Sequence, residues 1–134
     1  MGVYEFGPRE EAVFSRLAGV SRAMAFAGFA LAGLLVAAGV AAFVLPPAYL
    51  PRTVTAAMGA LLLCIAAPTA WSARALLRAA LGLGLVATTA GHDVPHAVTA
   101  GAGLRDAFRA VTVMLALDAL AAAALAGLVL PRGG

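Results

Sequence analysis

The sequence from residue 23 to residue 45 reads AMAFAGFALAGLLVAAGVAAFVL and contains no charged side chain. A helix needs about 20 mostly apolar residues to cross a bilayer core of roughly 30 Å. Residues 53–72 repeat this pattern, and residues 110–130 repeat it with a single acid, Asp118. The sequence therefore predicts three transmembrane spans, at about 23–45, 53–72 and 110–130.

The composition is typical of an integral membrane protein. Of its 134 residues, 63% are hydrophobic and 11% are charged, and its mean hydropathy is +1.01. Soluble domains contain about 45–50% apolar residues. Three spans leave no room for a separate soluble domain, so residues 1–134 are expected to form a single transmembrane domain with the lipid bilayer as its surroundings.

The charges predict a topology. All nine basic residues are arginines, and the predicted spans leave seven on one side and two, Arg52 and Arg132, on the other. The seven are Arg9, Arg16, Arg22, Arg74, Arg78, Arg105 and Arg109. Because the side richer in arginine faces the cytoplasm, the N-terminus is expected inside and the C-terminus outside. The arginines do not form one patch, so nucleic acid is not expected as a partner.

The source is expected to be bacterial. The chain is rich in alanine and arginine and has no lysine, asparagine or glutamine, which is typical of a GC-rich genome. The predicted location is therefore a bacterial cytoplasmic (inner) membrane, which the chain crosses several times.

The helices are expected to extend past the spans on the arginine-rich side. Pro8 and Glu10 favour a helix start, and an apolar stripe follows at three- and four-residue spacing. That stripe consists of Val13, Phe14, Leu17, Val20 and Met24. The sequence predicts an all-α fold with helices at about 9–45, 53–89 and 94–130. They would form an up-down-up bundle with a helical stalk in the cytoplasm.

An antiparallel hairpin with its turn near His92 fixes which residues of the second and third helices face each other. Their numbers should sum to about 184. This register places Arg78 opposite Asp106, where an ion pair is expected. It also places Asp118 opposite residue 66, within two or three positions.

Asp118 is the strongest functional lead, because an acid near the middle of a bilayer costs on the order of 2.5–3.5 kcal/mol. Pro68 has no N–H, so the carbonyl of Cys64 loses its usual helical donor. We hypothesise that a protonated Asp118 donates a hydrogen bond to this carbonyl. The acid would then serve either as interhelical glue or as a relay for protons or cations. A lipid-exposed or snorkelling acid at an edge of the span is the third interpretation that the sequence leaves open.

Stripes of small residues predict close helix packing. They are Gly28 and Ala32, Gly33 and Ala37, Ala56 and Ala60, and Ala119, Ala123 and Ala126. Two glycine pairs, Gly82 with Gly84 and Gly101 with Gly103, are expected to permit close helix contact or local bending in the stalk. Three helices cannot bury every stripe, so a homo-oligomer or other membrane subunits are expected as partners.

No residue pattern predicts a reaction. His92 and His96 are weak candidates for metal ligands. We therefore expect no metal site. No histidine lies in a span, so no cofactor is expected either. The function predicted is that of a non-enzymatic structural or accessory subunit of a homo-oligomer or larger membrane complex. The alternative is a small oligomeric ion or proton channel that uses Asp118.

Overall fold

Three long helices make up almost all of the described chain in the computed structural model, which describes residues 6–88 and 93–129. Helix α1 spans Pro8–Val44, α2 spans Arg52–Val86 and α3 spans Asp93–Val129. The predicted all-helical fold with three helices is confirmed, and each observed helix end lies within three residues of its predicted position.

Local chemistry explains the helix ends. The Gly7 N–H donates to the Glu10 carboxylate at 2.6 Å, and Pro8 occupies the first turn of α1. A side chain that returns to the N-cap backbone in this way satisfies a donor that the helix cannot. Pro46 and Pro47 follow directly after α1 and cannot continue it. Pro68 lies inside α2, and the helix continues through it.

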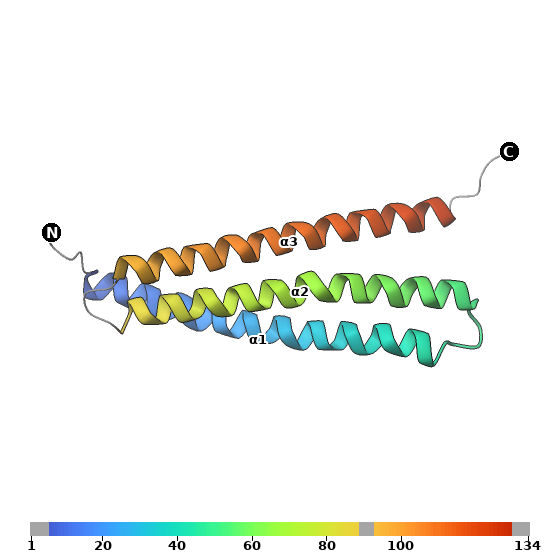
Figure 1. The fold of residues 1–134 in the computed structure, drawn as a ribbon, viewed down its shortest axis with the longest axis horizontal. Helices are drawn as coiled ribbons and strands as arrows, with labels where there is room; N and C mark the ends of the chain where they lie inside the picture. The colour runs from blue at the N-terminus through green and yellow to red at the C-terminus, as the bar shows by residue number, and fades with distance from the viewer. Residues whose placement is uncertain (1–5, 89–92, 130–134) are drawn as a thin grey trace.

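The helices run antiparallel in sequence order, with α2 in the middle (Figure 1). Helix α2 packs against both α1 and α3, whereas α1 and α3 do not pack along each other. Only near one end does a common cluster form, where Ala18, Leu83 and Ala100 meet. The arrangement is therefore an open three-helix layer with little enclosed interior.

Small residues fill the contacts between the helices. Buried residues of α1 are Ala18, Ser21, Ala25, Ala32 and Gly39, and most of those of α2 are alanine, glycine or threonine. Large apolar side chains are found outside instead, and Leu34, Phe108 and Leu120 are each about 70% exposed (68%, 72% and 68%). Burial thus follows side-chain size and not hydrophobicity.

Two of the described helices, α1 and α2, are long and apolar enough to cross a membrane, against the three spans predicted. The third predicted span, residues 110–130, ends outside the described residues. Length and composition alone support two crossings.

Two glycines of α3 provide a matched test of this packing. A Cβ atom added to Gly103 would lie 2.8 Å from the Ala79 backbone nitrogen, whereas one added to Gly101 would meet nothing within 4 Å. We expect Gly101→Ala to stabilise the protein by up to about 1 kcal/mol, because alanine favours helix over glycine. Gly103→Ala should destabilise it by about 1–3 kcal/mol through overpacking.

Thermal unfolding in detergent, followed by circular dichroism, measures both variants. Gly84→Ala and Gly82→Ala form a second pair, because Gly84 is open and a Cβ on Gly82 would lie 3.0 Å from the Ala100 nitrogen. Equal effects within each pair would contradict the close-packed interface.

Candidate functional site

The interface between helices is built at four close approaches. Along α1 and α2, Gly28 lies against Ala73 and Gly39 lies against Gly59, where an added Cβ would fall 2.9 Å from a carbonyl oxygen. Along α2 and α3, Gly82 lies against Ala100 and Gly103 against Ala79. Helix backbones approach this closely only where side chains are absent or a single methyl group.

These contacts fix the register of the three helices. The facing residues of Gly82/Ala100 and of Ala79/Gly103 sum to 182, within two of the predicted 184. Farther along, the Thr69 hydroxyl lies 3.5 Å from the Met114 sulfur. The α2–α3 hairpin therefore has close to the predicted alignment, and α1 can be aligned to α2 through Gly28/Ala73 in the same way.

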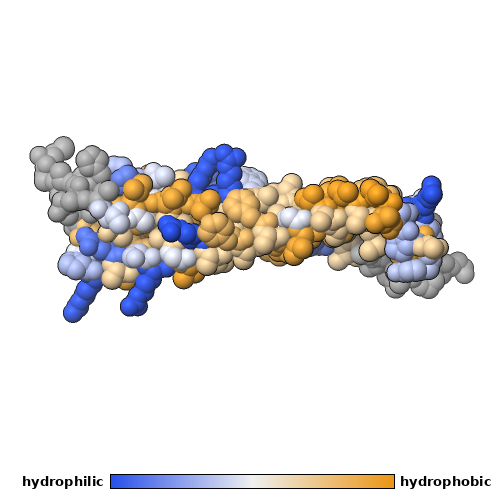
Figure 2. Space-filling view, turned by 90° about the horizontal axis from the view of Figure 1, so that it is seen from below, coloured by the Kyte–Doolittle hydropathy of each residue, from blue (hydrophilic) through white to orange (hydrophobic). Residues whose placement is uncertain are grey.

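The register gathers five arginines into one belt around the molecule. Arg74 and Arg78 belong to α2, and the alignment places Arg22, Arg105 and Arg109 level with residues 73–79 of that helix. At 1.5 Å per residue, the belt is about 9 Å wide. In Figure 2 hydrophilic side chains gather over one half of the molecule, and the surface between them and the far end is mostly apolar.

The apolar zone has the thickness of a bilayer core. It runs along α2 from the belt at about residue 73 to Arg52 at the first turn, which is roughly 30 Å of helix. The hydrocarbon core of a typical bilayer is also about 30 Å thick. Trp71 lies just inside the belt and is 48% exposed, as expected for an aromatic side chain at an interface.

Asp118 lies one helical turn beyond Met114 and therefore level with about residue 65 of α2, near the middle of the apolar zone. Its side chain is exposed on the surface of the three-helix layer, and so is Cys64. The hydrogen bond predicted between Asp118 and the Cys64 carbonyl is absent from the part of the chain that the structure describes. An exposed acid at this level lacks the intrachain partner that the sequence suggested.

Pro68 is buried between the helices, and its neighbour Thr69 carries the polar contact at this level. The Thr69 hydroxyl donates to the Ile65 carbonyl at 2.8 Å and also lies near the Met114 sulfur. The hydroxyl therefore adds a donor to the Ile65 carbonyl and does not reach the Cys64 carbonyl, whose helical donor Pro68 removes. The residue that joins α2 to α3 near Pro68 is thus Met114, which the sequence did not single out.

A hollow of about 380 Å³ lies between α2 and α3 and extends from the arginine belt towards the α2–α3 connection. Arg78 and Asp106 both line it, together with His96 and Thr99. The carboxylate of Asp106 lies 3.9 Å from the Arg105 Nε, and this is the ion pair of the described residues in place of the predicted Arg78–Asp106 pair.

His92 lies outside the described residues, and no three metal-ligating side chains cluster within them.

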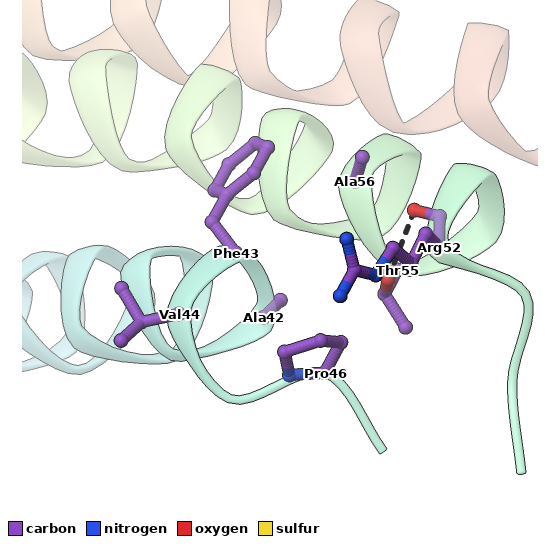
Figure 3. A pocket seen from close by; sticks show the side chains of 7 residues that line it. All are labelled: Ala42, Phe43, Val44, Pro46, Arg52, Thr55 and Ala56. Carbon is purple, nitrogen blue, oxygen red and sulfur yellow. Dashed lines mark hydrogen bonds between the residues drawn. The ribbon is translucent and has the colours of Figure 1, made fainter. Parts of the chain in front are cut away.

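A second hollow, of about 270 Å³, lies at the opposite end of the molecule between α1 and α2 (Figure 3). The Arg52 guanidinium extends into it towards Ala42 and Pro46, and the Thr55 hydroxyl donates to the Arg52 carbonyl at 3.0 Å. Helix α1 has no basic residue in its own last turn. Arg52 therefore places a positive charge where the α1 dipole is negative, and the hollow needs no ligand to explain it.

The predicted packing residues divide between buried and exposed positions. Gly28 and Ala32 lie against α2, whereas Gly33, Ala37, Ala119 and Ala123 are exposed, and the side chain of Ala126 lies outside what the structure describes. The α1 row that packs on α2 is longer than predicted and also includes Ala18, Ser21, Ala25 and Gly39. The alternating three- and four-residue spacing of these small residues is the signal that could have found it.

Comparisons with known proteins add no relative: no family model, curated protein or solved structure matches this chain.

The exposed position of Asp118 leads to a stability prediction. Asp118→Asn should change the unfolding free energy of the isolated chain by less than about 0.5 kcal/mol, as surface substitutions do. Chemical denaturation of the monomer in detergent measures it, and Asp106→Asn is an isosteric control outside the apolar zone. A loss of more than about 1.4 kcal/mol in Asp118→Asn alone would indicate an intrachain partner.

Proposed function

We propose that this protein is an integral membrane protein with three spans that acts as a structural or accessory subunit of a homo-oligomer or a larger membrane complex. One observation carries the proposal: small residues occupy the helix contacts while large apolar side chains face outward on all three helices. Soluble proteins rarely expose large apolar patches. Membrane helices pack through small residues because lipid solvates large apolar side chains as well as a protein interior does.

The arginine belt supports the orientation. Seven arginines on one side of the spans against two on the other support a cytoplasmic location for the stalk and the N-terminus of α1. The C-terminus then lies outside, and the bacterial inner membrane is the proposed location. The third span, residues 110–130, is part of this proposal, because its sequence carries only Asp118 as a charge.

The open layer supports a role in assembly over one in catalysis. Helices α1 and α3 are each packed on one side only, by α2. The hollow between α2 and α3 is lined by His96 and Thr99, but the Thr99 hydroxyl donates to the Pro95 carbonyl at 2.9 Å, and Cys64 lines neither hollow. The surfaces of α1 and α3 that α2 leaves uncovered are the proposed contact surfaces for other subunits and lipid.

Alkaline carbonate extraction and cysteine labelling test the membrane proposal. In a Cys64→Ala background, Ser15→Cys should react with an impermeant maleimide only from the cytoplasmic side, and Ala48→Cys in the α1–α2 loop only from outside. A C-terminal epitope tag should be accessible from outside if there are three crossings. Release by carbonate, or a tag on the same side as Ser15, would contradict the proposal.

A small oligomeric channel is the second candidate, favoured by the exposed carboxyl of Asp118 near the middle of the apolar zone. Reconstitution in liposomes separates the two functions. The subunit role predicts no proton or cation flux for the wild type and altered assembly for Asp118→Asn. The channel predicts wild-type flux that Asp118→Asn abolishes while its oligomer, sized in mild detergent, stays intact.

A further inference from the structure

Helix α1 carries two parallel rows of residues at heptad spacing, one residue apart in sequence. The inner row packs on α2 and is buried or half-buried throughout: it is Phe14, Ala18, Ser21, Ala25, Gly28, Ala32, Leu35 and Gly39. The outer row is exposed throughout: it is Val13, Leu17, Val20, Met24, Ala27, Leu31, Leu34 and Ala38. Each row advances by alternating steps of four and three residues, which is the repeat of a coiled-coil seam.

The outer row continues to expose large apolar side chains where α1 extends beyond the apolar zone. Between Pro8 and the arginine belt, the exposed large apolar side chains of α1 are Val13, Leu17 and Val20, at 55%, 47% and 58% exposure. All three belong to this row, and the exposed residues around them include Arg9, Ser15 and Arg16. Lipid covers apolar side chains inside a membrane, but these three lie beyond the belt, where a protein partner would cover them.

The occupant must itself be a long helix with unusual properties. It has to follow the outer row for about 25 residues, from the stalk past Arg22 and into the apolar zone, without a charge on its contacting face. The outer row of a second α1 meets this description. No charged residue lies on it from Val13 to Ala38, so two copies side by side bring no like charges together along that length.

Two copies in one membrane share one topology, so their α1 helices run parallel about a two-fold axis, the commonest symmetry of homo-oligomers. The next seam position before Val13 is Glu10, one heptad before Leu17. In a parallel pair, such a residue packs beside the residue that precedes its counterpart. Glu10 of each copy therefore faces Glu10 of the other, with Arg9 of the other copy beside it as the compensating charge, and the uncharged seam begins at Val13.

We infer that the outer row of α1 binds the same row of a second copy of this chain in a parallel two-helix coiled coil. This inference rests on the proposed membrane topology and names the partner of the proposed assembly. The dimer places α1 and its counterpart at the centre, with an α2 flanking each of them through the inner row. Helix α3 stays at the outer edge, where its surface is available to lipid or further subunits.

Cysteine cross-linking in native membranes tests the inference. In the Cys64→Ala background, Leu17→Cys and Val20→Cys should form same-residue disulfide dimers with copper-phenanthroline, because facing seam residues lie within disulfide reach. Ser15→Cys and Gly19→Cys are matched controls, exposed on the same stretch of α1 but off the row. Dimers equally abundant at seam and control positions, or absent from the seam, would overturn the inference.

Charge substitution provides a second measurement. Leu17→Glu combined with Val20→Glu should raise the dimer dissociation constant on the order of 100-fold, because like charges would face each other across the seam. Ser15→Glu combined with Gly19→Glu adds the same charge off the row and should leave the dissociation constant within about twofold. Energy transfer on dilution into lipid vesicles measures both, and equal weakening by the two pairs would refute the seam.

Carbonate extraction of the wild type keeps the two hypotheses apart. A wild type that resists extraction but forms no seam dimer retains the membrane proposal and removes the second copy as occupant of the outer row. A wild type released by carbonate removes the proposed function, together with the parallel orientation that the inference takes from it.

Discussion

The close approach of helix backbones at glycine and alanine is the constraint on which the rest of this structure depends. At Gly39/Gly59 and Gly103/Ala79 an added Cβ would fall within 3 Å of atoms of the facing helix, including its backbone. Contacts of this kind recur along α2 on both of its packed faces, so α2 holds α1 and α3 in a fixed register. That register brings five arginines to one level and places Asp118 near the middle of the apolar zone. A larger residue at either contact would separate the helices and alter both placements.

The sequence was sufficient for the helices and for the α2–α3 alignment, because both depend on local chemistry. Pro46, Pro47 and Pro95 mark helix ends through their missing N–H and fixed φ angle, and a short hairpin leaves little freedom in register. The inward face of α1 could not be read in the same way. The stripe Val13, Leu17, Val20 and Met24 has the spacing of a core face, yet all four side chains are exposed. In water, large apolar side chains mark the face of a helix that is buried. Here the small side chains mark it, because they allow the helices to approach more closely.

Asp118 illustrates the same limit at a single residue. The residue of α2 that lies level with Asp118 was predictable, because the α2–α3 hairpin sets the register. The group that contacts its carboxyl was not. Which side of a helix faces a neighbour depends on how α3 lies across α2, and one helical turn separates the half-buried Met114 from the exposed acid. Helix α1 does not cover this part of α3, because it packs on the other side of α2. In the proposed membrane location, water or a group from outside the chain would offset the cost of this carboxyl.

The molecule has an open shape because α1 and α3 both pack on α2 and not along each other. Within the described residues α2 separates α1 from α3 along most of their length, and the hollows described above lie towards opposite ends of the molecule. The molecule does have two long helix surfaces with different chemistry: α1 offers a heptad row without charge from Val13 to Ala38, and α3 offers large apolar side chains, with Asp118 as the single charge after Arg109. Two such surfaces on opposite edges allow a symmetric contact through α1 while α3 remains available for a second interaction. This shape supports the proposed role as a subunit that connects partners in a membrane.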